Sequence, residues 1–208
     1  MIEAQTPSIV EIVTKERILD TFFKVDKVTV SHERFDGQMS EPRPLLVLDR
    51  GDAVAALLYD PERRKVIAVN QFRLPTFGKG DGWLIEAVAG MITWNKDGTH
   101  AETPDECLRR EVEEETGYRL GDFKQLCTYF PSGGGCSERI FLYYAEVTFS
   151  HKTTEGGGLA DEGEDIAQVE YDLDDFFGKL DAGYFEDGKL IAAGYWLMAQ
   201  HARSHAAA

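Results

Sequence analysis

Long hydrophobic runs are missing from this 208-residue sequence. No apolar stretch approaches the ~20 residues that a membrane-spanning helix requires, so we expect no membrane segment and no membrane partner. The first residues, MIEAQTPSIVEIVTKER, lack the basic start and the apolar centre of a signal peptide. We therefore expect a cytoplasmic protein.

Cysteine is scarce as well, with three residues and no C-x-x-C spacing. An odd number of cysteines without paired spacing fits a reducing compartment and argues against a structural zinc site. Cys136 lies beside a run of glycines, so catalysis by its thiol is one alternative for this neighbourhood.

Positive charge is in deficit, because 22 Lys and Arg face 37 Asp and Glu and leave a net charge of −15. Nucleic acids and anionic membranes bind to cationic faces, so we expect neither as a partner. A small anionic substrate is compatible with this charge if a divalent metal ion and a few arginines neutralise it locally. With 43% hydrophobic residues, the chain can bury one domain, alone or with a smaller appendage.

Residues 1–50 have near-alternating apolar and polar positions from Phe23 onward. This alternation predicts two or three strands, with turns near Asp26 and at Asp36-Gly37. A small antiparallel sheet of this size is not stable alone. We therefore expect it to pack on the main domain, residues 51–208, or on another subunit.

Longer apolar runs follow Gly51. AVAALLYD and VIAVNQFRLP, joined by the charged turn PERRK, predict a hairpin of buried strands. After them come GWLIEAVAG, an acidic helix, FKQLCTYF, ERIFLYYAEVTF, IAQVEYDLDDFFGKLDAGYF and an apolar terminal helix around LIAAGYWLMAQHA. Strands mixed with helices in this order predict an α/β or α+β sandwich.

The acidic helix is predicted within Glu102–Tyr118, ETPDECLRREVEEETGY. Thr103 suits the N-cap, Pro104 the first helical position and Glu106 a capping box, whereas Gly117 suits the left-handed residue after the helix. The helix is therefore expected to begin and end sharply.

Glu111 and Glu115 lie one turn apart, on the same face of this helix. Arg110 can reach Glu114, which leaves Glu111 and Glu115 unpaired. Neighbouring carboxylates repel, so a cation is one explanation for their retention. A solvated helix face is the other explanation, and the charge pattern alone does not separate the two.

From Arg110 the chain reads R-E-V-E-E-E-T-G-Y, and Glu102 lies seven intervening residues upstream. This fits R-E-U-x-E-E-x-G-U, where U is apolar or aromatic, and it resembles the signature of the Nudix hydrolases. Ala89 and Gly90 supply the preceding A-G. Eleven residues separate Gly90 from Glu102, about six more than the usual pattern. We expect this insertion, between Thr93 and His100, to lengthen a surface loop without moving the glutamates.

Two further loops narrow the resemblance. S-G-G-G-C-S-E, Ser132 to Glu138, reads alone as a hairpin turn, and G-L-A-D-E-G-E-D, Gly158 to Asp165, reads alone as a solvated or calcium-binding loop without the EF-hand ligand order. Together they resemble the nucleoside-diphosphate-sugar pyrophosphatase branch, with ADP-ribose pyrophosphatase and GDP-mannose hydrolase. N-Q-F-R and E-A-V-A-G, Asn70 to Arg73 and Glu86 to Gly90, resemble motifs of the same branch.

The resemblance implies a mixed sheet between helices, an α/β/α sandwich, and a site that holds two or three Mg²⁺ ions, with Mn²⁺ as an alternative. It implies metal ligands at Glu111, Glu115, Glu164 and the carbonyl of Ala89, and a general base at Glu162.

Arg73 would hold phosphate, because a guanidinium fork matches phosphate geometry. The other residues implied by the resemblance fall into two groups. Substrate contacts are expected at Glu86, Gly90 and Glu138, and structural roles at Glu102, Arg110, Glu114 and Gly117.

A homodimer is also implied, in which the N-terminal sheet of one subunit helps to hold the nucleoside base of the other. Phe35, Arg43 and Arg50 are the candidates for that contact, and ordinary packing or surface exposure is the alternative for each.

The expected function is metal-dependent hydrolysis of the pyrophosphate bond of a nucleoside diphosphate sugar. ADP-ribose, cleaved to AMP and ribose 5-phosphate, is the leading substrate, and GDP-mannose or another nucleotide sugar is the alternative. Gly133 occupies the place of a proline associated with ADP-ribose enzymes, which leaves the substrate open. A non-catalytic sensor is the third hypothesis, and the complete set of glutamates argues against it.

Overall fold

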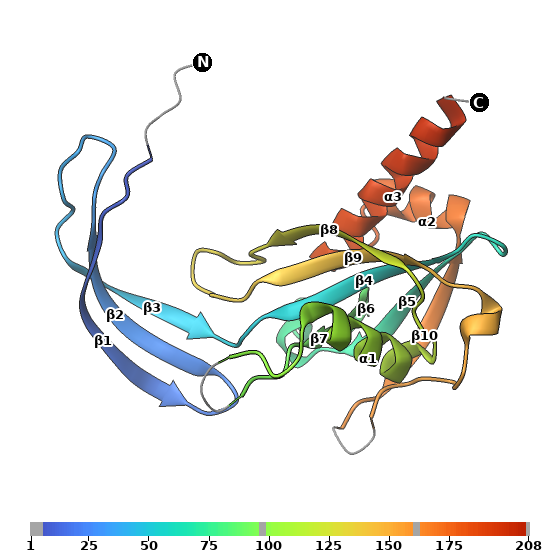
Figure 1. Ribbon diagram of the computed structural model, residues 1–208, viewed down its shortest axis with the longest axis horizontal. Coiled ribbons are helices and arrows are strands. Elements are labelled where there is room, and N and C mark those ends of the chain that lie inside the picture. Colours follow the sequence, from blue (N-terminus) through green and yellow to red (C-terminus); the bar gives the residue numbers. More distant parts are fainter. Residues whose placement is uncertain (1–5, 96–98, 160–162, 207–208) are drawn as a thin grey trace. The chain divides into compact units, whose positions relative to one another are not determined.

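A computed structural model describes residues 6–95, 99–159 and 163–206. The chain divides into two compact units. The first joins the residues up to Gly51 with Phe130–Glu138, and the second contains Asp52–Tyr129 and Arg139–Ala208. Each unit has its own sheet (Figure 1).

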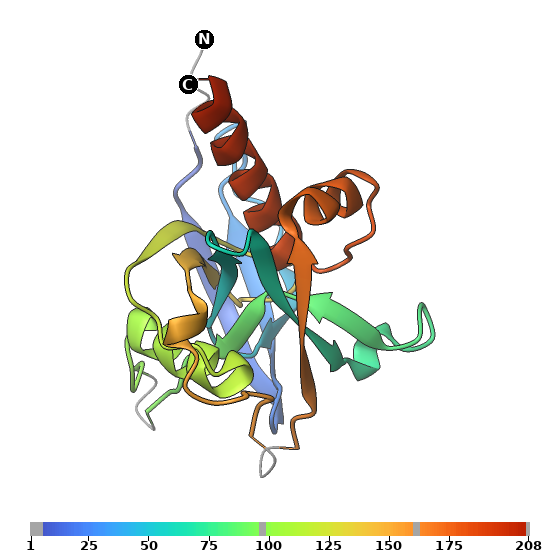
Figure 2. The same cartoon turned by 90° about the vertical axis from the view of Figure 1, so that its right-hand side faces the viewer.

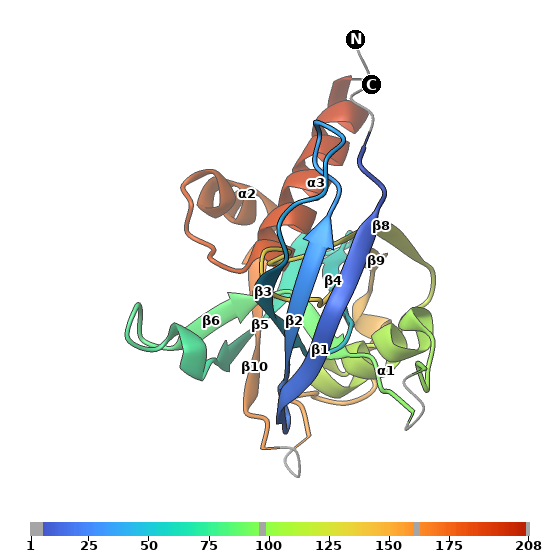
Figure 3. The ribbon, with the colours of Figure 1, turned by 90° about the vertical axis from the view of Figure 1, so that its left-hand side faces the viewer.

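The first unit is built on a three-stranded antiparallel sheet in the order β1-β2-β3 (Figure 3). Its strands are β1 (Val10–Asp20), β2 (Lys24–His32) and β3 (Arg43–Asp49). The turn predicted at Asp36-Gly37 is confirmed, because Gly37 has a left-handed φ of 78° and its amide donates to the carbonyl of Arg34.

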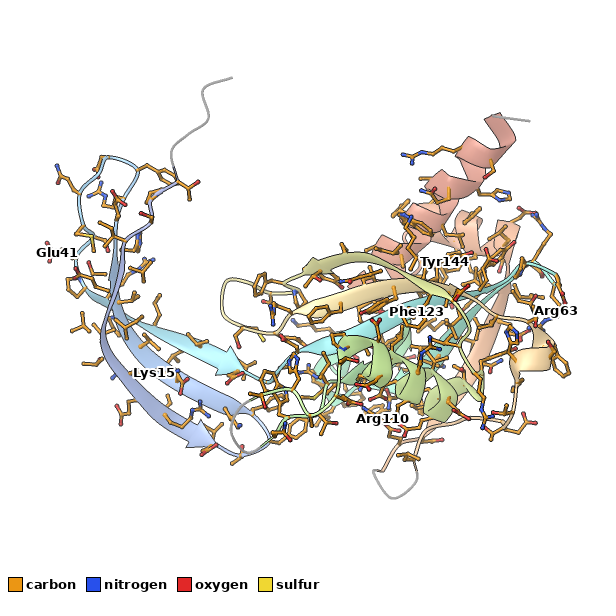
Figure 4. All side chains as sticks on the ribbon, in the orientation of Figure 1. Lys15, Glu41, Arg63, Arg110, Phe123 and Tyr144 are labelled. Atoms are coloured by element: carbon orange, nitrogen blue, oxygen red, sulfur yellow. The ribbon has the colours of Figure 1, made fainter. Side chains whose placement is uncertain are left out.

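The turn predicted near Asp26 is wrong, because the chain turns at residues 21–23 and Asp26 lies inside β2. Asp26 is buried, and its carboxylate pairs with Arg17 and Lys15 of the neighbouring strand β1 (Figure 4 labels Lys15). The hydrogen bond from Arg17 lowers the pKa of Asp26. These two cations, which come from another strand, stabilise an aspartate that by itself suggests a turn.

This sheet has no apolar core of its own. All eleven residues of β1 are exposed, and within the described part of β1–β3 only Asp26 and Ser31 are buried. Large apolar side chains are exposed instead, namely Ile12, Val13, Ile18, Leu19, Leu45 and Leu46. Such a surface is typical of an element that packs against another surface.

The second unit contains a seven-stranded sheet in the order β10-β5-β4-β9-β8, with β6 paired to β5 and β7 paired to β4. The strands are β4 (Ala53–Asp60), β5 (Lys65–Phe72), β6 (Trp83–Glu86), β7 (Val88–Met91), β8 (Phe123–Tyr129), β9 (Ile140–Glu146) and β10 (Ile166–Asp172). The helices are α1 (Pro104–Thr116), α2 (Leu173–Asp181) and α3 (Gly188–Ala206), with short 3₁₀ turns at Leu74–Thr76 and Phe149–His151. None of the described helices combines the length and hydropathy needed to cross a membrane.

Helices cover both faces of this second sheet (Figures 1 and 2). The central strand β4 alternates its side chains between them, because Val54 and Leu58 pack in one cluster with Leu108 of α1, whereas Leu57 packs in another with Leu190 of α3. Strands β4 and β9 are parallel and the other pairs are antiparallel. The mixed sheet between helices confirms the predicted fold class.

Helix α1 begins and ends at the predicted residues. Thr103 and Glu106 form the capping box, and Pro104 is the first helical residue. Gly117 has a φ of 74°, and a Cβ there would lie 2.0 Å from the carbonyl oxygen of Thr154. Both the conformation and the close approach therefore require glycine at this end of the helix.

The run GWLIEAVAG forms two strands that pair with different neighbours. β6 pairs with β5 up to Glu86, and β7 pairs with β4 from Val88 onward. Ala87, between them, is buried, and its amide donates to Oδ2 of Asp187 at 3.0 Å. The chain thus changes its partner strand directly before Ala89 and Gly90.

Candidate active site

Glu111 and Glu115 lie against the backbone of β7. Oε2 of Glu115, a residue that is 3% exposed, accepts a hydrogen bond from the amide of Ala89 at 3.3 Å. A Cβ on Gly90 would lie 1.8 Å from the carboxyl carbon of Glu111. The position of the Glu111 side chain therefore requires glycine at residue 90.

Arg110 of α1, which is labelled in Figure 4, contacts three carboxylates. Its Nη1 lies 3.0 Å from Glu114 Oε2 and 2.8 Å from Glu111 Oε1, and its Nη2 lies 2.9 Å from Glu102 Oε1. The predicted contact with Glu114 is confirmed. The expectation that Glu111 is left unpaired is wrong, because the guanidinium fork presents enough donors to reach both neighbours.

Burial makes both central carboxylates hard to ionise. It raises the pKa of Glu111 to about 7 and the pKa of Glu115 well above its usual range. The charge of Glu111 raises the pKa of Glu115 further, and the charge of Glu164 raises both pKa values. These three carboxylates therefore lie close enough to repel one another.

A divalent cation fits this set of donors. Within the described residues, no group of three or more His, Cys, Asp or Glu side chains forms a ready metal site. The available donors are nevertheless the oxygens that Mg²⁺ prefers, and Mg²⁺ keeps several water or substrate ligands rather than needing a closed protein cage. Positive charge would also relieve the repulsion between Glu111, Glu115 and Glu164.

Glu164 is held by its own loop. The amide of Leu159 donates to Oε2 of Glu164 at 2.9 Å, and a Cβ on Gly158 would lie 2.6 Å from the same oxygen. Gly158 also has a φ of 80°, so two features favour glycine there. Glu162, the predicted general base, lies outside the described residues, and its role stays a prediction.

Arg73 lies next to a buried cluster of charges. Its Nε is 2.6 Å from Oε2 of Glu86, and Oε1 of Glu86 is 3.1 Å from Nζ of Lys189. Lys189 lies in turn 2.7 Å from Oδ1 of Asp187. The sequence reasoning missed Lys189 and Asp187. The sequence D-G-K-L at the beginning of the terminal helix could have identified Asp187 as its N-cap, because aspartate is preferred at that position.

The other predicted substrate contacts lie in the first unit. Arg50 Nε is 3.4 Å from Oε1 of Glu138, and the segment Gly133–Ser137 borders a hollow of about 400 Å³ with β3. Phe35 is 84% exposed in the β2–β3 connection, where it lines a second hollow of about 620 Å³. Arg43 begins β3, so Phe35 and Arg43 lie toward one end of that strand and Arg50 lies beyond the other.

The two ends of the inserted segment contact each other before α1 begins. The amide of Asn95 donates to the carbonyl of Thr99 at 2.8 Å, and the rings of Trp94 and His100 contact each other with centroids 4.4 Å apart. Residues 96–98 of the insertion lie outside the described residues. Thr93 donates from both its amide and its hydroxyl to Glu102, which ties the base of the insertion to the carboxylate cluster.

Comparison with known proteins identifies the family of this chain. The family described as NUDIX domain matches residues 49–193. A GDP-mannose pyrophosphatase from Pectobacterium atrosepticum is 34% identical over 199 residues, which cover 93% of each chain. A protein of the same name from Cronobacter sakazakii is 32% identical over 194 residues, 92% of this chain and 94% of its own.

A third GDP-mannose pyrophosphatase, from Escherichia coli, is 32% identical over 190 residues, 90% of this chain and 94% of its own. The family match spans most of the chain and contains α1, β7 and the loop of Glu164. The chain therefore belongs to the Nudix family, as a hydrolase that acts on phosphorus-containing anhydrides.

Proposed function

We propose that this Nudix hydrolase cleaves the pyrophosphate bond of GDP-mannose, giving GMP and mannose 1-phosphate. Two glutamates lie against Ala89-Gly90, the partly buried Glu111 and the buried Glu115, and this pair is the observation that carries the reaction class. The relatives named GDP-mannose pyrophosphatase support this substrate over ADP-ribose, which becomes the second candidate. Gly133, in the place of the proline associated with ADP-ribose enzymes, agrees with that order.

The proposed metal ligands are Glu111, Glu115, Glu164 and the carbonyl of Ala89. Nudix hydrolases use divalent metal ions, and two or three Mg²⁺ ions bound there would offset the charge of the pyrophosphate oxygens and lower the pKa of the attacking water. Arg110 orients the helix carboxylates by holding Glu111 from one side. This arrangement explains why the chain retains buried carboxylates that repel one another.

Glu162 is the proposed general base. It would accept a proton from the water as the water oxygen attacks phosphorus and the bond to the bridging oxygen breaks, with the second phosphate as the leaving group. Arg73 would bind a phosphate oxygen pair, exchanging part of its contact with Glu86 for the substrate.

A homodimer completes the proposal. The exposed apolar side chains of β1 and β3 form a surface of the kind that a second subunit covers. In such a dimer Phe35, Arg43 and Arg50 would contact the nucleoside base, because aromatic rings and guanidinium groups stack on bases.

A substrate panel tests the function. GDP-mannose, ADP-ribose and NADH are incubated with Mg²⁺ or Mn²⁺, and the phosphomonoester products are converted to phosphate by a coupled phosphatase. We expect kcat/KM for GDP-mannose to exceed that for ADP-ribose by roughly tenfold or more, the difference of a few well-placed contacts. A higher kcat/KM for ADP-ribose would reverse the proposed order, and binding without any turnover would favour the sensor hypothesis.

A further inference from the structure

We propose that Asp187, directly ahead of α3, is a positioning residue for the metal-binding backbone at Ala89. The inference rests on the proposed function, because it takes the carbonyl of Ala89 as a metal ligand. It concerns a different part of the chain, since Asp187 belongs to no segment of the Nudix signature.

The change of partner strand at Ala87 creates the need for such a residue. Glu86 is the last residue of β6 in the ladder with β5, and Val88 is the first of β7 in the ladder with β4. Ala87 falls between the two ladders and is 1% exposed. A buried amide that lacks a ladder partner must find another acceptor, and Oδ2 of Asp187 accepts from it at 3.0 Å.

Asp187 is itself held firmly enough to position a backbone. It is buried, and Oδ2 also accepts from the amide of Leu190 at 3.1 Å, in the first turn of α3. Its Oδ1 accepts from the amide of Lys189 at 3.3 Å and from Nζ of Lys189 at 2.7 Å. The carboxylate therefore joins the beginning of α3 to the junction of β6 and β7.

The charges around this junction balance. Asp187 and Glu86 are both buried carboxylates, and Lys189 and Arg73 are the cations that pair with them. Lys189 touches both carboxylates, so the residue before Ala87 is linked to the same helix as Ala87 itself. Lys189 still has Glu86 as a partner when the charge of Asp187 is removed, so this link to α3 is separate from the hydrogen bond between Asp187 and Ala87.

The hydrogen bond between Asp187 and Ala87 lies close in sequence to the candidate metal ligand. Only Val88 lies between Ala87, whose amide donates to Asp187, and Ala89, whose amide donates to Glu115 at 3.3 Å. The backbone is thus fixed from α3 on one side and from α1 on the other. The orientation of the Ala89 carbonyl follows from both attachments, and loss of Asp187 removes one of them.

Binding of Mn²⁺ to the substrate-free protein tests the inference, measured from the EPR signal of the free ion. Asp187→Ser keeps an oxygen that can cap α3 but is too short to reach Ala87 as well, and we expect its dissociation constant for Mn²⁺ to rise at least fivefold. Asp187→Asn keeps an oxygen that can accept from both Ala87 and Leu190, and we expect its dissociation constant to stay within twofold of the wild-type value.

Leu197→Ala is the matched control. Leu197 is buried on α3, so this variant loosens the helix without touching the junction. We expect it to lower the melting temperature and leave the Mn²⁺ dissociation constant unchanged. The inference is overturned if Asp187→Ser binds Mn²⁺ like the wild type, if Asp187→Asn loses as much affinity as Asp187→Ser, or if Leu197→Ala weakens binding equally.

The proposed function and the inference fail in different ways. If the wild-type protein neither binds Mn²⁺ nor cleaves a nucleotide sugar, the proposed function fails and takes the inference with it. If the wild type does both and the Asp187 variants behave like it, only the inference fails.

Discussion

Glu111 and Glu115 oppose folding when no cation is bound. Their pKa values are raised by burial and by mutual repulsion, so the folded state holds protons on them more tightly than the unfolded state does. In the absence of metal, ionisation of these groups therefore lowers stability as the pH rises from about 4.5, the ordinary pKa, through about 7. The proposed metal site therefore reduces the stability of the fold when no cation is bound.

Glu115→Gln is expected to have opposite effects on activity and on stability. Turnover should fall by roughly a hundredfold or more, because a proposed metal ligand is lost. In EDTA at pH 8, the melting temperature should rise by about 3–8 °C, because the repulsion is removed. Calorimetry at pH 5 and pH 8 should show that this gain is smaller at pH 5, where more of the wild-type carboxyl is protonated.

Glu113→Gln is the control for this variant, because Glu113 lies on the same helix and pairs with Arg119 at its surface. Its turnover should match the wild-type value. Full activity of Glu115→Gln would remove Glu115 from the metal site.

Glu162→Gln is expected to lose about 100-fold in turnover while it binds Mn²⁺ with wild-type affinity, as for a general base that is not a ligand. Single-turnover kinetics and Mn²⁺ binding together make the distinction. Glu155→Gln, in the same loop, is the control, because Glu155 is exposed and lies outside the acidic motif Gly158 to Asp165. An unchanged rate in Glu162→Gln would assign the base to another residue.

Residues whose roles depend on near neighbours in sequence could be predicted from sequence alone. Thr103, Pro104 and Gly117 define α1 through local caps, and the helix begins and ends where those caps place it. Asp26 could not be placed this way, because the cations that hold it in β2 come from β1. Asp187 could not be assigned either, since its partner Ala87 lies 100 residues away and only the packing of α3 brings them together.

At the scale of elements, α1 and the inserted segment before it are joined through Glu102. Arg110 of α1 donates to Glu102, which also accepts from Thr93, and these hydrogen bonds lower the pKa of Glu102 to about 2. The segment that distinguishes this chain from the usual Nudix pattern is therefore hydrogen-bonded to a residue that also pairs with α1, the helix of the proposed metal ligands Glu111 and Glu115. The spacing of the motif predicts structural roles for Arg110 and Glu102. The contact of Glu102 with Thr93 could not be predicted, because it depends on the path of the inserted segment.

Glu102→Gln is expected to reduce the free energy of unfolding at pH 7 by about 1–3 kcal/mol. The upper value is the free energy that corresponds to the whole pKa shift of Glu102, and the lower value allows for its partial exposure to solvent. Because the folded-state pKa is depressed, the contribution is complete above about pH 4.5 and is lost as the pH falls toward 2. Urea unfolding of both proteins at pH 7, 4 and 3 measures this. A difference that grows as the pH falls would contradict the role of Glu102.

At the scale of the whole molecule, a large negative charge accompanies an uncovered apolar sheet. Two copies with a net charge of −15 each repel at long range, and salt screens that repulsion. Association through β1 and β3 would therefore rest on apolar burial and should strengthen with ionic strength. Neither the net charge of the molecule nor the exposed surface of a whole sheet can be read from the residues of a single strand. The sequence therefore predicts the sheet more readily than the surface that covers it.

The proposed dimer can be tested by light scattering after gel filtration. We expect the wild type at about twice its chain mass of 23.3 kDa. Ile12→Lys should shift it toward the monomer by placing a charge in the apolar surface, whereas Glu16→Lys, at an exposed polar position of the same strand, should stay dimeric. A wild-type monomer at micromolar concentration would refute the dimer.

The hydrogen bond between Ala87 and Asp187 can form only late in the synthesis of the chain. Asp187 leaves the ribosome 100 residues after Ala87, which at about 5–20 residues per second is a delay of roughly 5–20 s. During that interval the residues of β7 and α1 have been synthesised, whereas the acceptor for the amide of Ala87 has not. In the proposed role of Asp187, the backbone at Ala89 therefore reaches its final position only after the residues of α3 have been synthesised.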